Sequence, residues 1–232
     1  MRIVKQKEKF AVDNLDEKFG CGLNGQRVFR HGPLLPSSVR GLIIGPSNCG
    51  KTNAMISLLT HPQGLRFRNV YLYSKSLNQP KYQYLRSVLE PIKGLGFYTF
   101  SNNAEIVEPS DAKPNSVFIF DDVICEKQDI IRSYFCMGRH KDVDCFYLAQ
   151  TYSRVPKQLV RDNTNFIIMF KQDETNLHHI YSDHVSPDVT FKQFQLMCVK
   201  CWEDQYGFLV IDKDRKIDEG RYRKGFDSFI YP

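Results

Sequence analysis

The 232-residue chain lacks any long apolar segment. Its longest clean apolar runs are short, such as residues 166–170 and 208–211, whereas a membrane-spanning helix needs about 20 apolar residues. The first ten residues contain three lysines and no apolar stretch of the kind that forms a signal peptide. We therefore expect neither insertion into a membrane nor secretion.

The chain also lacks the cysteine pattern of a disulfide-rich scaffold. Its seven cysteines are an odd number at irregular spacing, and Cys125 and Cys145 lie in apolar runs, where cysteine behaves as a small hydrophobe. A reducing compartment is the better interpretation. Cys198 and Cys201, with three histidines upstream, resemble half of a zinc site. No second pair completes it, and residues three apart share one helix face, so core packing is preferred.

No internal repeat or biased tract is present, and 42% hydrophobic with 25% charged residues is a globular composition. The length favours one domain of ordinary size. The net charge is +6. A basic surface permits a phosphate backbone as partner, but solubility alone explains this charge equally well.

The pattern divides the chain into three parts. Residues 1–38 are polar and glycine-rich and read as a lead-in arm, residues 39–212 carry the regular pattern, and residues 213–232 form a basic C-terminal tail. The tail either contacts a phosphate backbone or is simply solvated. Its basic and aromatic residues are Arg221, Tyr222, Arg223, Lys224 and Phe226.

Apolar runs alternate with segments of helical periodicity. Strands are predicted at residues 39–44, 70–73, 97–100, 117–120, 145–149, 166–170 and 206–211. Helices are predicted at residues 51–59, 82–89, 129–137, 176–181 and 191–201. Strands that are apolar on both faces and alternate with helices imply a mostly parallel sheet covered on both sides. The expected fold class is therefore a three-layer α/β fold.

A glycine-rich loop joins the first strand to the first helix. Its sequence, GPSNCGKT, fits the pattern of Gly, four residues and Gly-Lys-Thr, which binds nucleotide phosphates. The glycines let backbone N–H groups turn toward phosphate oxygens, and the helix N-terminus adds a positive field. Lysine reaches the β and γ phosphates and threonine offers a hydroxyl to Mg²⁺. The expected binding residues are Gly45, Pro46, Ser47, Asn48, Cys49, Gly50, Lys51 and Thr52.

Two polar strand ends complete the expected site. Residues 117–120 run into Asp121 and Asp122, a position at which a carboxylate can hold Mg²⁺ and a second can act as general base toward water. We assign Asp121 to the metal and Asp122 to the water. The alternative is that both only begin a turn. The strand at 145–149 ends in Gln150, which fits a sensor of the γ-phosphate or of the water, or is a plain exit to a loop.

With these elements in order, the chain resembles the HerA–FtsK superfamily of P-loop ATPases. It looks most like the genome-packaging ATPases of poxvirus-like large DNA viruses and of Polinton/Maverick elements. The resemblance covers roughly residues 28–212. It is carried by GPSNCGKT, FIFDDV at residues 118–123, GRHKDVDCFYLAQTY at residues 138–152 and RVPK at residues 154–157. Many relatives carry Asp-Glu where this chain has Asp121-Asp122, so the shorter Asp122 must approach the water more closely.

The resemblance implies a RecA-like P-loop ATPase that uses ATP and Mg²⁺ to move double-stranded DNA into a viral or virus-like capsid. It implies a homo-oligomeric ring, a pentamer or hexamer, that contacts capsid proteins. It also implies that the ring works in the host cytoplasm or nucleus, where virions assemble. Ring ATPases need an arginine from the neighbouring subunit. Arg139 is the first candidate and Arg154 the second, although either also fits a solvated surface charge.

Two other functions remain possible from the residues. A nucleoside or nucleotide kinase would share the phosphate loop, but the Asp-Asp pair followed by a glutamine argues against it. A DNA- or capsid-binding protein with a vestigial site would be expected to have lost residues such as Lys51, Thr52 or Asp121, which are present. A GTPase is disfavoured because the chain has no Asn-Lys-x-Asp segment.

Overall fold

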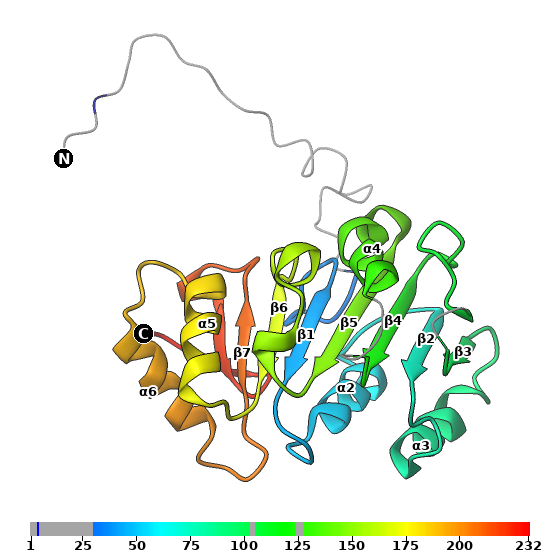
Figure 1. Cartoon of the computed structure of the whole chain (residues 1–232), viewed down its shortest axis with the longest axis horizontal. Coiled ribbons are helices and arrows are strands. Elements are labelled where there is room, and N and C mark those ends of the chain that lie inside the picture. Colours follow the sequence, from blue (N-terminus) through cyan, green and yellow to red (C-terminus); the bar gives the residue numbers. More distant parts are fainter. Residues whose placement is uncertain (1–3, 5–29, 103–104, 124–127) are drawn as a thin grey trace. The chain divides into compact units, whose positions relative to one another are not determined.

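A single sheet forms the centre of the structure (Figure 1). The computed structural model describes residue 4 and residues 30–102, 105–123 and 128–232. Within these residues nine strands pair in the order β3-β2-β4-β5-β1-β6-β7-β8-β9. In that order the strands are β3 (Gly96–Phe100), β2 (Asn69–Ser74), β4 (Ser116–Asp121), β5 (Val143–Ala149), β1 (Arg40–Ile44), β6 (Phe166–Met169), β7 (Leu209–Asp212), β8 (Tyr222–Lys224) and β9 (Ser228–Ile230).

The six strands from β3 to β6 pair in parallel, and β7, β8 and β9 add an antiparallel edge. The predicted mostly parallel α/β class is therefore confirmed. The last predicted strand begins three residues late, at Leu209, because the chain turns first. Gly207 N donates to Asp204 O at 2.9 Å, and a Cβ at Gly207 would lie 2.0 Å from the Cys201 carbonyl oxygen.

Helices cover both faces of the sheet, which gives the three layers. They are α2 (Lys51–Thr60), α3 (Pro80–Leu89), α4 (Asp129–Met137), α5 (Glu174–His184) and α6 (Phe191–Cys201). Apolar residues of α4, α5 and α6 share one core cluster, and those of α2 and α3 share the other. Successive residues of β1 alternate between the two: Leu42 and Ile44 belong to the first and Ile43 to the second. Such alternation is what a strand buried on both faces requires.

The end of the lead-in packs against the start of β5. Leu35 and Val39 are buried, and His31 Nε2 lies 2.9 Å from Asp144 Oδ2. Asp144 Oδ1 accepts a bond of 2.7 Å from the Val39 backbone N–H. Because the Nδ1 atom of His31 accepts from Arg66 N, the proton of this imidazole lies on the nitrogen that faces Asp144. Residues 5–29 of the proposed arm lie outside the described residues.

Residues 213–232, where no strand was predicted, contribute β8 and β9 to the sheet edge. Arg223 is fully buried, with its guanidinium 2.9 Å from the buried Asp212 carboxylate and also bonded to the Leu34 carbonyl oxygen. The expectation that Arg223 is solvated or contacts a phosphate backbone is therefore wrong. Arg223 is buried because the buried Asp212 carboxylate needs a counter-charge, which Arg223 and Arg215 supply.

Cys198 and Cys201 are both fully buried in the core cluster beneath α6. Burial raises the pKa of both thiols above the ordinary value, so they stay protonated. Their environment is that of core residues.

A buried polar network holds the segment that follows β5. The Tyr152 hydroxyl lies 2.7 Å from Asp183 Oδ2 and 2.8 Å from His184 Nε2. Lys213 Nζ lies 3.5 Å from His184 Nδ1, so this nitrogen is the acceptor and Nε2–H donates to Tyr152. Tyr152 then donates to Asp183, which also accepts from Arg161 at 3.0 Å. The network ties the chain just beyond Gln150 to α5.

The buried imidazole of His184 is expected to make the stability of the fold depend on pH. Burial lowers the pKa of His184 to about 3, against an ordinary value of 6.5. The unfolded chain therefore binds a proton first, so the contribution of neutral His184 is complete above pH 6.5 and is lost as the pH falls toward 3. We expect His184→Gln to be less stable than the wild type at pH 7.5, by about 1–3 kcal/mol for the broken network.

Urea unfolding at pH 7.5 and pH 5 measures this effect. The deficit of His184→Gln should shrink at pH 5, because the wild type alone loses up to about 1.4 kcal/mol per pH unit through this group. His179→Gln, an exposed position on the same helix, is the matched control and should follow the wild type at both pH values. An equal loss of stability of His184→Gln at pH 7.5 and pH 5 would contradict the lowered pKa of His184.

Candidate nucleotide-binding site

The loop between β1 and α2 has the backbone of a phosphate cradle. Gly50 precedes α2 with φ +113°, a conformation that side chains disfavour, and Asn48 also has a positive φ of 62°. Gly45 is needed for a different reason: any larger side chain would clash, because a Cβ there would lie 2.5 Å from Cys49 Sγ and 2.7 Å from Phe170 Cβ. Both glycines are thus required by the loop itself, as the sequence pattern predicts.

Lys51, the first residue of α2, folds back over this loop. Its Nζ donates to the carbonyl oxygens of Gly45 and Pro46, at 2.7 and 2.9 Å. Burial lowers the pKa of Lys51, and the charges of Asp121 and Asp122 oppose that shift. The ammonium is therefore held at the mouth of the loop, where an anion can replace the carbonyl groups as its partner.

The two carboxylates follow β4 at the same edge of the sheet. Asp121 is the last residue of β4 and is paired in register with Ser74 of β2 and Leu148 of β5. Burial raises the pKa of Asp121, and a hydrogen bond from Tyr82 acts in the opposite direction. Asp122 has a φ of 58°, so the chain does turn here, as the alternative interpretation held. Both side chains nevertheless line one cavity with Lys51.

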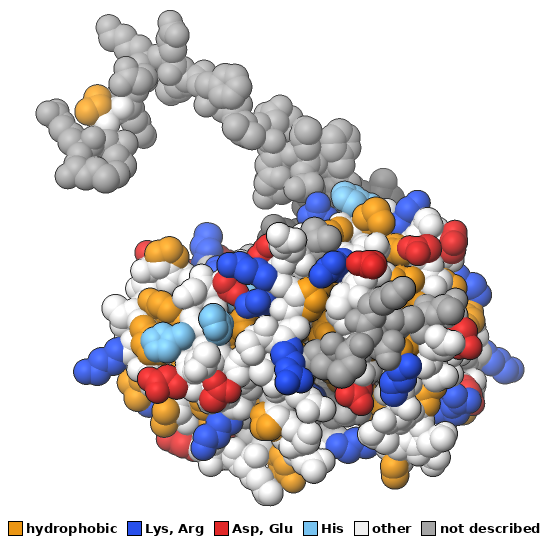
Figure 2. All heavy atoms as spheres, in the orientation of Figure 1, with side chains coloured by type: hydrophobic (Ala, Val, Ile, Leu, Met, Phe, Trp, Pro, Cys, Tyr) orange, Lys and Arg blue, Asp and Glu red, His pale blue; other side chains and the backbone are white. Residues whose placement is uncertain are grey.

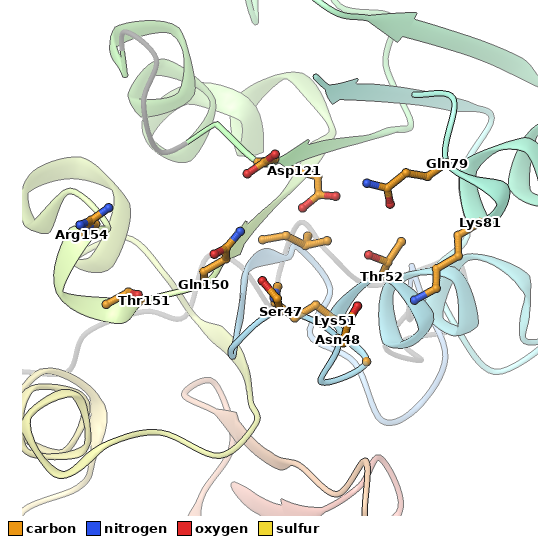
Figure 3. A pocket seen from close by; sticks show the side chains of 13 residues that line it. Ser47, Asn48, Lys51, Thr52, Gln79, Lys81, Asp121, Gln150, Thr151 and Arg154 are labelled. Carbon is orange, nitrogen blue, oxygen red and sulfur yellow. The ribbon is translucent and has the colours of Figure 1, made fainter. Parts of the chain in front are cut away.

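Gln150 is placed by the position of β5 between β4 and β1. Ala149 of β5 is in register with Ile44, the residue before the loop, and Leu148 is in register with Asp121. Gln150, one residue further, therefore lies between the loop and the carboxylates. Figure 3 shows its side chain between Asp121 and Ser47.

These groups border a cavity of about 360 Å³. Its lining residues are Ser47, Asn48, Gly50, Lys51, Thr52, Gln79, Lys81, Asp121, Asp122, Leu148, Gln150, Thr151 and Arg154. Gly45 and Cys49 are not among them, and Pro46 lines a second, adjoining hollow with Ser47 and Gln150. The structure thus brings together at one edge most of the residues expected in the site.

The cavity also contains residues that the sequence analysis missed. Gln79 and Lys81 come from the start of α3, and Figure 3 shows them on the side of the cavity that also holds Thr52. A signal for them was available. The helix that follows β2 begins at the carboxyl edge of the sheet, where the loop and the carboxylates also lie.

The two candidate arginines lie in different places. Arg154 lines the cavity of its own chain, on the opposite side from Lys81 (Figure 3). Arg139 is exposed in the 3₁₀ turn Gly138–Lys141, which precedes β5. The seven residues of β5 separate this turn from Gln150 by about 23 Å at roughly 3.3 Å per residue. Arg139 is therefore remote from the cavity of its own chain.

Basic side chains do not gather into one patch on the face shown in Figure 2, where lysines and arginines alternate with acidic residues. That face therefore offers no separate basic surface among its described residues.

The family described as Poxvirus A32 protein matches residues 26–214. No curated protein matches the chain significantly in sequence.

Solved structures of viral proteins share the fold. The genome packaging NTPase B204 of Sulfolobus turreted icosahedral virus 2, in complex with AMPPCP, is 14% identical with a TM-score of 0.56, covering 81% of this chain and 97% of that one. B204 from Sulfolobus turreted icosahedral virus, described as the DNA-packaging ATPase, is 14% identical with a TM-score of 0.52, covering 80% and 95%. At this identity the likeness shows the fold alone. The family match spans most of the chain, and it includes the loop, both carboxylates and Gln150, so the chain belongs to the Poxvirus A32 protein family.

Proposed function

We propose that this protein is a Mg²⁺-dependent ATPase that drives double-stranded DNA into a viral or virus-like capsid, as a homo-oligomeric ring at sites of virion assembly in the host cytoplasm or nucleus. The observation that carries the proposal is the convergence of the phosphate loop, Asp121, Asp122 and Gln150 at one edge of the sheet. A phosphate cradle, a metal carboxylate, a base and a polar sensor are the parts that phosphoanhydride hydrolysis needs.

The similar structures favour an ATP-dependent DNA-packaging function over the other candidate functions. One is a packaging NTPase that holds AMPPCP, another is the same protein with ATP-gammaS, and a third is described as a DNA-packaging ATPase. Neither a kinase nor a vestigial binding protein gains similar support. Within the described residues no helix has the length and apolar character needed to cross a membrane.

The loop and Lys51 bind the triphosphate. Backbone N–H groups from Ser47 to Thr52 and the N-terminus of α2 stabilise the phosphate oxygens, and Lys51 exchanges its carbonyl partners for oxygens of the β and γ phosphates. Lys81 adds a second positive charge at the cavity wall.

Thr52 and Asp121 are suited to hold magnesium. Hydroxyl and carboxylate oxygens are the hard ligands that Mg²⁺ prefers. Both side chains border the cavity. Asp121 accepts a hydrogen bond from the hydroxyl of Tyr82, and Thr52 lies near the same hydroxyl. When bound, the ion neutralises charge on the β and γ phosphates.

Asp122 and Gln150 act on the water. Asp122 takes a proton from the water molecule. The oxygen of that water bonds to the γ phosphorus as the bond between this phosphorus and the oxygen that bridges it to the β phosphorus breaks. Gln150 orients the water or the γ-phosphate by hydrogen bonding. ADP and inorganic phosphate are the products.

ATP hydrolysis with and without duplex DNA tests the proposal. Lys51→Ala should abolish turnover, because the phosphates lose their main positive charge. Asp122→Asn should retain ATP binding while hydrolysis falls about 10²-fold or more, the scale of losing a general base.

Asp129→Asn is the matched control, because its side chain is 85% exposed on α4 and outside the cavity. It should leave turnover unchanged. Full activity of Asp122→Asn would show that this residue is not the general base. Transfer of phosphate from ATP to a nucleoside or nucleoside monophosphate would show that the protein is a kinase and not a DNA-packaging ATPase.

Arg139 is proposed to act on the nucleotide of the neighbouring subunit. Its exposure and its distance from its own cavity suit a group that acts between subunits. An arginine supplied in trans is worth about 10³–10⁵ in turnover in related P-loop enzymes. Activity should therefore rise more than linearly with protein concentration as rings form.

A mixing experiment separates the two sides of such a shared site. Arg139→Ala and Lys51→Ala subunits should each be inactive alone. A mixture of the two should regain partial activity, because Arg139→Ala removes the arginine of the shared site and Lys51→Ala removes the lysine that binds the phosphates. Lys141→Ala, exposed in the same turn, is the control and should stay active. If co-assembled mixtures show no recovery, the arginine is to be sought at Arg154 instead.

A further inference from the structure

Tyr82 of α3 reaches the candidate metal site from outside the motifs that define it. The side chain is 4% exposed, and its ring belongs to the apolar cluster formed by α2, α3 and the sheet. The hydroxyl donates to Asp121 Oδ2. A ring held by core packing thus presents one polar group to the carboxylate assigned to the metal.

Two further hydroxyl groups lie near that of Tyr82. The side chains of Thr52, in the first turn of α2, and Ser74, at the end of β2, lower the pKa of Tyr82 against the larger effect of burial, which raises it. Ser74 is fully buried and lies in register with Asp121. The hydroxyl of Tyr82 therefore binds the end of β4 and lies near the first turn of α2 and the end of β2.

We propose that Tyr82 is a positioning residue for magnesium, holding Asp121 beside Thr52 in the arrangement that receives the ion accompanying ATP. This role rests on the proposed function. The two oxygen ligands come from separate elements, and each side chain is free to rotate unless a neighbour holds it. A hydroxyl adds no charge that would compete with the cation, and groups that orient metal ligands in this way typically contribute about 10–100-fold to metal affinity.

The fixed ring makes this role separable from phosphate binding. Tyr82 does not line the cavity, whereas the phosphate loop and Lys51 do. Loss of the hydroxyl should therefore weaken the metal-dependent part of nucleotide binding and spare the metal-free part.

The test uses the full chain and the variant Tyr82→Phe, which keeps the buried ring. Binding of a fluorescent ATP analogue is measured in EDTA and in a Mg²⁺ titration, and Mn²⁺ binding in the presence of AMPPCP is followed by electron paramagnetic resonance. We expect unchanged affinity in EDTA, about 10-fold weaker metal binding by both readouts, and recovery of ATPase activity at raised Mg²⁺. Tyr84→Phe, on the same helix and 57% exposed, should match the wild type throughout.

Three results for Tyr82→Phe would overturn the role. An unchanged metal affinity would show that the hydroxyl does not organise the ligands, and a tighter one would show that it competes with the metal for Asp121. An equal loss in EDTA and in Mg²⁺ would mean general damage to the nucleotide site. A wild-type protein whose nucleotide binding gains nothing from Mg²⁺ would instead refute the metal assignment of the proposed function, and the positioning role with it.

Discussion

In the sheet β5 lies between β1 and β4, and this order decides which side chains meet at the nucleotide site. In a parallel sheet all strands end at one edge, so the neighbour of a strand decides which side chains meet there. Here β5 pairs with the loop strand on one side and the acidic strand on the other, which places Gln150 between the phosphate loop and Asp121. With β1 paired directly to β4, no polar strand end would separate the two.

Both ends of β5 are held by buried polar contacts. At its start Asp144 binds the Val39 N–H and His31, and beyond its end Tyr152 joins the network of Asp183 and His184. In the proposed ring this matters because the strand connects Arg139, ahead of its start, with Gln150, after its end. If Arg139 and Gln150 act as proposed, a strand fixed at both ends would couple the neighbouring subunit's nucleotide to the subunit's own.

Most of the fold could be predicted from local patterns. Strands buried on both faces read as continuous apolar runs, and α4 and α6 agree with the predicted limits, residues 129–137 and 191–201. The loop and the polar strand ends could be recognised because each depends on residues adjacent in sequence. The parallel class then brings those ends to one edge without further information.

What could not be predicted depends on contacts between distant segments. Arg223 reads as a solvated charge because its partner Asp212 lies across a turn and its carbonyl partner, Leu34, lies 189 residues away. Tyr82 reads as a core residue of a helix, which it is, and only the folded structure reveals that its hydroxyl meets Asp121. Lys81 and Gln79 carry no motif of their own, and only the position of their helix after β2 indicates that they lie at this edge of the sheet.

In the proposed function, ATP hydrolysis at this site drives movement along duplex DNA. Displacement of a fluorescent third strand from a DNA triplex by the assembled protein measures such movement. We expect displacement that requires ATP and Mg²⁺ and is absent with Lys51→Ala. Hydrolysis that is stimulated by duplex DNA but displaces no third strand would contradict this proposal.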